Sequence, residues 1–449
     1  VGESCIQDLA ERRGKKVSIN LFGQENFDET YAIACADMLL KGEGTQVNNI
    51  FFGSTISNDG FQKDEFDFML SNPPFGTPWK AELKAWGDIK KDEITDPRFI
   101  IDYDGNPEYS LIPDIGDPQM LFLANNISKM KQKTELGSRI VEVHNSSSIS
   151  TGGAGSGVSN LRRYIIENDL LEAIVALPEN MFYNTGIGTY LWIITNNKAP
   201  NRRGFVQLID ATSLKSTLRK NIGEKNCEIT PDIRRQIIDY YLKYDKADPN
   251  YSKVFKNEEF GYYSVDILRP LRLKMNLSHD QIEKTRTEIK DEDLISLVTD
   301  YRAECKSDTA YDFNAFMEWI LDAASSKGIK ITAKRKKALR DCFTEIDENA
   351  VPVKDAKGNL EQDKKLKDSE QVPLLYEGGM TAFFENEIVP YVPDAWIDID
   401  SAVLGYELTF TKYFYKPAEI REPSQIIADI KSVDKSTDGL LASIIQEVR

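Results

Sequence analysis

This sequence of 449 residues contains very few histidines and no closely spaced pair of cysteines. It contains only two histidines, His144 and His279, and neither has a second ligand-type residue at a metal-binding spacing. The five cysteines are scattered and form no Cys-x-x-Cys pair, which is typical of reduced thiols in the cytoplasm. We therefore expect a cytoplasmic protein with no metal site and no catalytic triad built on histidine.

Long apolar runs and an excess of basic charge are also missing. No uninterrupted apolar stretch approaches the roughly 18 residues that a membrane span needs, so we expect no membrane segment and no signal peptide. Lysine and arginine total 56 against 72 aspartates and glutamates, which gives a net charge of -16. Because such a surface repels phosphate backbones, any contact with nucleic acid must be local or made by a basic partner.

The residues that are present have the composition of an ordinary globular chain, with 41% hydrophobic and 29% charged residues. Its length predicts two or three domains. Strand and helix patterns alternate up to about residue 215, from the strand pattern of residues 17–23 to that of residues 205–210. This alternation predicts an α/β fold with a mostly parallel sheet covered on both faces. Helical patterns dominate the later part, and residues 423–448 are predicted to form two amphipathic helical pieces.

One segment predicts chemistry, because an asparagine and two prolines directly follow the apolar strand pattern of residues 66–70. Since two prolines cannot continue a sheet, Asn72 is expected at the carboxyl end of a parallel strand, where α/β sheets bind ligands. The Asn72 amide oxygen and the Pro73 carbonyl would accept hydrogen bonds from an exocyclic amino group. Phe75 would stack on a base flipped out of a duplex. The alternative is that the segment is only a turn.

A carboxylate also stands near the end of the strand pattern of residues 17–23. Glu25 precedes a helix pattern, and a carboxylate in this position binds ribose hydroxyls in nucleotide-binding sheets. The alternative is an acid that stabilises the positive end of the helix dipole.

Two further signals have plainer interpretations. The glycine-rich residues 151–157 lack the Lys-Ser/Thr of a phosphate-binding loop, so we interpret them as a flexible loop, with DNA contact as a weaker hypothesis. The Arg162 and Arg163 pair is predicted to lie on a solvated face, with phosphate contact as the alternative.

Several blocks together resemble one family. They are residues 22–25 (Phe-Gly-Gln-Glu), 53–55 (Gly-Ser-Thr), 72–76 (Asn-Pro-Pro-Phe-Gly), 179–187, 260–262, 269–273, 366–374, 392–398 and 405–415. With these blocks the chain resembles, over nearly its whole length, the modification subunit of type I restriction–modification systems, which is an adenine-N6 DNA methyltransferase. Asn-Pro-Pro-Phe alone fits any amino methyltransferase, whereas the later blocks make the resemblance specific.

The resemblance implies methyl transfer from S-adenosyl-L-methionine to a flipped-out adenine. It implies a Rossmann-like class I methyltransferase sheet in residues 1–275 and a largely helical, partner-docking region in residues 276–449. The implied partners are double-stranded DNA, a specificity subunit, an ATP-dependent restriction subunit and a second copy of the chain. The implied catalytic residues are Asn72, Pro73, Pro74 and Phe75, and the implied cofactor-binding residues are Glu25, Asn26, Ser54 and Asn72.

Two departures from the family pattern leave other functions open. The glycine-rich cofactor loop of the family is not in the sequence, so we expect an N-terminally incomplete sheet and a chain that is inactive by itself. Ser54 stands where the family usually has aspartate, which puts cofactor affinity there in question. The alternatives are a non-catalytic or truncated assembly subunit, or the same chemistry on cytosine N4, RNA or a protein amide.

Overall fold

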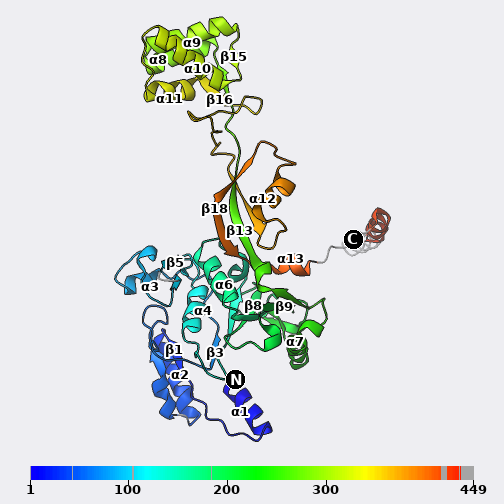
Figure 1. The fold of residues 1–449 in the computed structure, drawn as a ribbon. Coiled ribbons are helices and arrows are strands. Elements are labelled where there is room, and N and C mark those ends of the chain that lie inside the picture. The colour runs from blue at the N-terminus through cyan, green and yellow to red at the C-terminus, as the bar shows by residue number, and fades with distance from the viewer. Residues whose placement is uncertain are drawn as a thin grey trace, which may run out of the picture.

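The computed structural model describes residues 2–42, 44–103, 106–183, 185–415, 422–433 and 435 (Figure 1). At its centre is a six-stranded sheet in the order β12-β9-β7-β8-β6-β3. The strands of this sheet are β3 (Phe68–Ser71), β6 (Arg139–Asn145), β7 (Leu171–Ala176), β8 (Thr189–Thr195), β9 (Phe205–Asp210) and β12 (Ser252–Lys256).

The central sheet is mixed, so the prediction of a mostly parallel sheet was wrong. β3 pairs with β6 and β7 pairs with β9 in parallel, whereas β8 runs antiparallel to both of its neighbours, β6 and β7. β12 is antiparallel to β9. The reason lies in the connection between β7 and β8, residues 177–188, in which the described residues form no helix. A parallel neighbour needs a crossover connection, usually a helix, while an antiparallel one does not.

Helices cover both faces of most of this sheet, which confirms the α/β class. One face packs against α4 (Gln119–Ser128) and α6 (Gly157–Glu167), which bury Leu121, Leu161 and Ile165 against Ile140 and Trp192. The other face packs against α7 (Pro231–Lys243). Each fully buried side chain of this size contributes about 1.5–3 kcal/mol, so the sheet and its helices form the main core.

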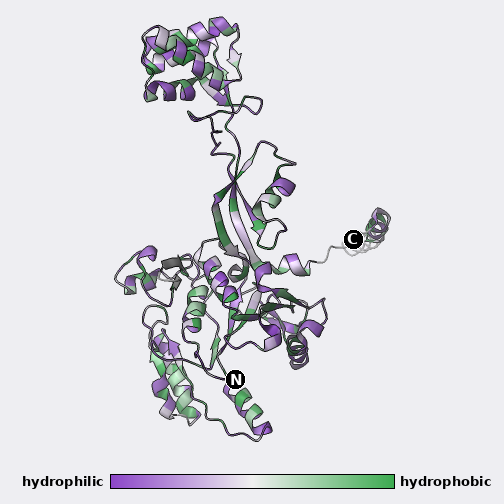
Figure 2. Ribbon diagram, viewed as in Figure 1, coloured by the Kyte–Doolittle hydropathy of each residue, from purple (hydrophilic) through white to green (hydrophobic). Residues whose placement is uncertain are grey.

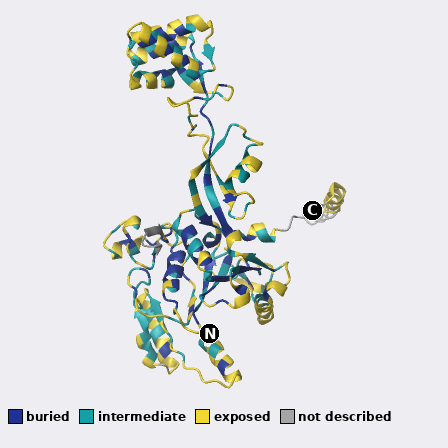
Figure 3. Cartoon of the chain, viewed as in Figure 1, coloured by how far each residue is buried: buried dark blue, intermediate teal, exposed yellow. Residues whose placement is uncertain are grey.

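A second, smaller unit lies at the N-terminal end of the chain. It contains α1 (Gly2–Arg12), β1 (Gly23–Glu25), α2 (Asp28–Leu40) and β2 (Ile50–Phe52), and β1 and β2 form a separate parallel pair. The prediction of a strand over residues 17–23 was wrong, because β1 begins only at Gly23. Figure 3 shows little buried surface in this unit, and Val17 and Phe22 are exposed. Without a buried face, the alternating pattern has no neighbour against which to form a strand.

The central sheet has an uncovered edge next to this unit. β3 is the last strand of its sheet and does not pair with β1. Phe68 and Leu70, which share one face of β3, are 52% and 70% exposed. The rings of Phe22 and Phe66, just before β1 and β3, have centroids 5.3 Å apart. The two strands therefore begin close together but form no ladder.

The C-terminal half adds an antiparallel sheet in the order β17-β13-β18 and a separate helical subdomain (Figure 1). The strands are β13 (Gly261–Leu268), β17 (Asp368–Pro373) and β18 (Trp396–Tyr406), which the helical patterns did not predict, and short helices α12 (Gly379–Phe383) and α13 (Phe410–Phe414) accompany them. The helical subdomain contains β14 (Leu273–Asn276), α8 (His279–Ile289), α9 (Glu292–Cys305), β15 (Thr309–Ala310), α10 (Phe313–Ser326), α11 (Ala333–Phe343) and β16 (Thr344–Ile346), with its own apolar core. The division of the chain after residue 275 stays a prediction.

Further short elements lie between the strands and helices of the central unit. They are α3 (Lys80–Ala85), β4 (Ile100–Tyr103), β5 (Asn106–Ser110), α5 (Ser147–Ser150), β10 (Ser216–Ile222) and β11 (Lys225–Glu228). Residues 423–433 are helical as predicted, and nearly all of the second predicted piece lies outside the described residues. No described helix combines the length and the apolar composition that a bilayer span requires.

Candidate cofactor and base site

The carboxyl ends of β1 and β2 bring Glu25 and Ser54 together. The parallel register pairs Glu25 with Phe52, and the Gly53 N–H donates a hydrogen bond to the Glu25 carbonyl at 2.9 Å. The side chain of Glu25 accepts hydrogen bonds through Oε1 from the Asn26 and Phe27 amides at 2.8 and 2.9 Å. This carboxylate therefore supports the start of α2, as one interpretation of the sequence held, while Asn26 beside it is exposed.

Gln24 ties the loop after β2 to β1, a role that the sequence interpretation missed. Its Nε2 donates to the carbonyls of Gly53 at 3.0 Å and Asn58 at 2.7 Å, and its Oε1 accepts from the Gly60 amide at 3.2 Å. Gly60 lies against the ring of Phe51, where an added Cβ would meet ring carbon at 2.2 Å. These contacts hold residues 53–60 in one conformation next to Glu25.

Ser54 lies beside a carboxylate that comes from another element. Its hydroxyl donates to Glu82 Oε2 at 2.7 Å and accepts from the amides of Ile56 and Ser57 at 3.2 and 3.4 Å. Glu82 belongs to α3, 28 positions further along the chain, and no motif or spacing in the sequence pointed to it. A negative charge is thus present at Ser54 although the residue itself is neutral.

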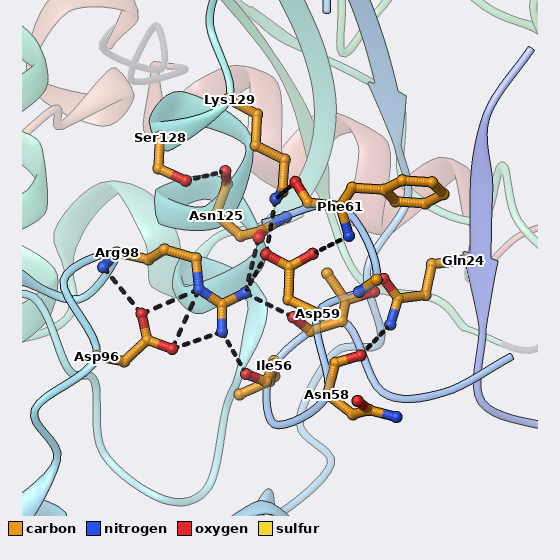
Figure 4. Close-up of polar contacts among 12 residues, drawn as sticks. Gln24, Ile56, Asn58, Asp59, Phe61, Asp96, Arg98, Asn125, Ser128 and Lys129 are labelled. Carbon is orange, nitrogen blue, oxygen red and sulfur yellow. Dashed lines mark hydrogen bonds and ion pairs between the residues drawn. The ribbon is translucent and has the colours of Figure 1, made fainter. Parts of the chain in front are cut away.

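A buried network of charges fixes this loop against α4 (Figure 4). Asp59 is buried and lies 2.7 Å from Lys129 Nζ and 3.3 Å from Arg98 Nη1. Arg98 also donates to the carbonyls of Thr55 at 2.8 Å and Ile56 at 2.6 Å. Since each of these carbonyls lies within two residues of Ser54, the network sets the position of the Ser54 turn.

The charges of this network balance. Arg98 also pairs with Asp96 at 2.6 Å, so two cations face two carboxylates. Burial opposes the ionisation of Asp96, but the hydrogen bonds and the positive charge of Arg98 outweigh it and hold the pKa of Asp96 below its ordinary value. Apart from Asp96 and Arg98, the partners come from distant segments of the chain, so no local sequence pattern predicted the network.

The Asn-Pro-Pro-Phe segment directly follows β3. The side chain of Asn72 is exposed and has no hydrogen-bond partner within the described part of the chain. Pro73 is buried, Pro74 is exposed and Phe75 is half-buried. Gly76 follows with a φ of 60°, a left-handed conformation that glycine adopts without strain. The segment is therefore a rigid turn that leaves the Asn72 amide open to a ligand.

The predicted site residues lie on two separate sheets. Glu25, Asn26 and Ser54 gather at the ends of β1 and β2, whereas Asn72 to Phe75 follow β3. The Ser54–Glu82 hydrogen bond links the two groups, because Glu82 belongs to α3, the helix that follows the Asn-Pro-Pro-Phe turn. No hydrogen bond between described residues connects Asn72 directly to Glu25 or Ser54.

Arg162 has a structural role, which corrects both of its interpretations. It is fully buried and donates to the carbonyls of Tyr406 at 2.6 Å, Ser148 and Thr151 at 3.0 Å, and Gly152 at 3.1 Å. The glycine-rich loop of residues 151–157 lines a cavity of about 800 Å³ beside these bonds. Arg162 thus binds backbone of this chain and, being fully buried, lies on no solvated face.

Comparison with known proteins identifies relatives of the chain. Residues 4–266 match the family model described as N-6 DNA Methylase. Two relatives from Methanocaldococcus jannaschii, the type I restriction enzyme MjaIX and MjaVII methylase subunits, are 27% and 25% identical over 58% and 61% of this chain and 42% and 46% of their own lengths. The chain thus spans less than half the length of these curated relatives.

Solved structures of methyltransferase subunits also match. One is the type I restriction–modification methyltransferase subunit from Streptococcus thermophilus, with 21% identity, a TM-score of 0.45, and coverage of 57% of this chain and 49% of that one. Another is the M protein of the type I restriction enzyme EcoKI, with 16% identity, a TM-score of 0.37, and coverage of 54% and 45%.

Proposed function

Because the chain belongs to the N-6 DNA methylase family, we propose that it forms the methyltransferase body of a type I restriction–modification enzyme and methylates adenine N6 in double-stranded DNA. The observation that supports this most is the Asn72 amide at the end of β3, inside the segment that matches the family. It is exposed and has no hydrogen-bond partner among the residues that the structure describes. A rigid turn with an open amide suits an amino group that must be held in one orientation.

The residues of the turn have separate roles in this proposal. Asn72 Oδ1 and the Pro73 carbonyl accept the two N–H bonds of the amino group, which concentrates electron density on its nitrogen. Phe75 stacks on the flipped base, a contact worth about 1–3 kcal/mol. S-adenosyl-L-methionine, when bound, supplies the electrophilic methyl group. The contribution of the chain is positioning and electrostatic stabilisation.

The ends of β1 and β2 fit the nucleoside part of that cofactor. Glu25 uses Oε1 for the Asn26 and Phe27 amides just before α2, so its Oε2 is available to ribose hydroxyls, and the exposed Asn26 lies beside it. Glu82 holds a carboxylate at Ser54, where an adenine amino group needs an acceptor. We therefore assign Glu82 to the cofactor site together with Glu25, Asn26, Ser54 and Asn72.

The uncovered edge of β3 limits what the chain does by itself. β1 and β3 are unpaired with each other, and the cofactor residues and the Asn72 turn are attached to different sheets. We propose that a further strand between them completes the site, so the chain alone binds the cofactor weakly. A purely assembly role is the alternative that this gap favours.

The proposal includes partners. Residues 423–433 form a helix with exposed Ile426, Ile427 and Ile430, a surface suited to docking on a specificity subunit. A restriction subunit and a second copy of the chain would complete the complex. The five free cysteines suit a cytoplasmic location.

The test is transfer of tritiated methyl to duplex DNA by the chain combined with its specificity subunit. Replacement of Asn72 by alanine should reduce the rate by about 10²–10³, the loss typical of one preorganised hydrogen-bonding group. Asn250→Ala, at an exposed turn, is the matched control and should retain the activity. Label in N4-methylcytosine, RNA or protein would refute the adenine acceptor, and an unlabelled wild-type reaction would favour the assembly role.

A further inference from the structure

The helical subdomain contains a concentrated basic segment in an otherwise acidic chain. Residues 327–340 include seven basic residues and no acidic one, although the net charge of the whole chain is -16. The basic residues are Lys327, Lys330, Lys334, Arg335, Lys336, Lys337 and Arg340. Most of them lie on α11, which is largely hydrophilic in Figure 2.

Part of this charge stabilises the subdomain itself. Arg335 pairs with Asp291 at 2.7 Å and Asp293 at 3.2 Å, which fixes α11 against the start of α9. Lys327 pairs with Asp300. Arg340 pairs with Glu361 at 2.8 Å. These pairs account for three of the seven cations.

The other four lysines form what we call the basic surface, made of Lys330, Lys334, Lys336 and Lys337. All four side chains are exposed, and none lies within ion-pair distance of a carboxylate in the described part of the chain. Leu339 and Phe343 are buried and define the inner face of α11. At 3.6 residues per turn, Lys334 and Lys337 point away from that face, whereas Lys336 lies at its edge with an exposed side chain.

The composition of this surface fits a phosphate backbone better than a protein. No large apolar side chain is exposed in residues 327–341. Protein interfaces are enriched in aromatic residues and depleted of lysine, whereas lysine commonly contacts phosphate without regard to sequence. α11 has 11 residues and is therefore about 16 Å long, over which a duplex has about nine phosphate charges.

We propose that the basic surface binds the phosphate backbone of duplex DNA, independently of sequence, on a part of the duplex that flanks the modified base at a distance. This inference rests on the proposed function for its choice of DNA. It gives an acidic chain a local electrostatic contact with its substrate, on a subdomain that lies far from β3, the strand that Asn72 follows, in Figure 1.

The test compares two triple variants of the full chain combined with its specificity subunit. K334Q/K336Q/K337Q removes three charges from the basic surface, and K357Q/K364Q/K365Q removes three from the neighbouring exposed loop. Glutamine and lysine have similar helix propensities, so the fold of α11 should persist, which circular dichroism would verify. The dissociation constant is measured for two duplexes of unrelated sequence at several salt concentrations.

The surface variant should bind both duplexes more weakly, and the slope of log K against log salt should become shallower by about 2–3, at roughly 0.9 for each lost phosphate contact. The loop variant should keep the wild-type slope. Equal losses in both variants, an unchanged slope in the surface variant, or no duplex binding by the wild type would overturn the proposal. So would a loss of specificity-subunit binding with DNA affinity intact, because the surface would then dock protein.

Methyl transfer, measured in parallel, separates the two proposals. If the wild-type chain methylates adenine but the surface variant keeps the wild-type salt slope, only the proposal about the basic surface is refuted. If the surface variant has a shallower salt slope but the wild-type chain transfers no methyl group, only the proposed function is refuted.

Discussion

Replacing Arg162 by methionine tests whether one buried cation holds the C-terminal strand to the central body. Arg162 on α6 is fully buried and donates Nε to the Tyr406 carbonyl at the end of β18, 244 positions away in the chain. Burial lowers the pKa of Arg162 to about 10, although the charges of Tyr262 and Glu407 oppose this shift. Methionine keeps an unbranched apolar stem of similar length and removes only the guanidinium.

The expected cost follows from the hydrogen bonds lost and the burial penalty relieved. The guanidinium donates to four backbone carbonyls, and each charge-assisted bond contributes about 1.5 kcal/mol at the low end of its range, or about 6 kcal/mol together. A pKa lowered to about 10 from the ordinary value of arginine corresponds to about 3 kcal/mol of unfavourable burial, which the substitution relieves. We therefore expect R162M to destabilise the fold by about 3 kcal/mol.

The assay is urea unfolding followed by circular dichroism, with Arg163→Met as the matched control on the same helix. Arg163 pairs with Glu167 at 3.0 Å one turn along α6, and a pair of this kind is worth about 0.3–0.5 kcal/mol. The midpoint should fall strongly for R162M and little for R163M, with similar m-values. If the two variants differ by less than about 1 kcal/mol, the argument that Arg162 secures β18 is refuted.

Two further predictions concern pH and the buried network. Burial raises the pKa of Tyr164 and Tyr190, so the folded state keeps protons that the unfolded state loses above about pH 10, and stability should decline as the pH rises from there. A urea midpoint that stays constant from pH 9 to pH 11 would contradict this expected decline, since these two pH values are about one unit below and above the ordinary pKa of tyrosine. Asp59→Asn should cost about 3–5 kcal/mol, because it leaves Arg98 and Lys129 buried beside each other without their shared carboxylate. In the Asp59→Asn variant, a protease should cleave within residues 53–61 faster than in the wild type. If the variant is as resistant as the wild type, the network does not hold this loop.

Local signals in the sequence predicted local features. Two prolines after an apolar run were sufficient to place Asn72 at the end of β3, because proline excludes continuation of the strand. The antiparallel direction of β8 was missed, since it depends on a connection without a helix. The Ser54–Glu82 bond and the Asp59 network join residues far apart in sequence, and no periodic pattern encodes such pairings. The buried position of Arg162 was missed for the same reason.

The open edge of β3 explains why the candidate site is present only in two parts. A parallel strand placed between β1 and β3 would pair with the free backbone groups of both, and adjacent strands lie about 4.8 Å apart. A helix accompanying that strand would cover Phe68 and Leu70, which are otherwise large apolar side chains exposed on an edge strand. The same strand would lock the ends of β1 and β3 into one sheet, so that Glu25 and Asn72 face a common ligand. In the proposed site, cofactor affinity should therefore depend on completion of the sheet, because both require a strand that pairs with β1 and with β3.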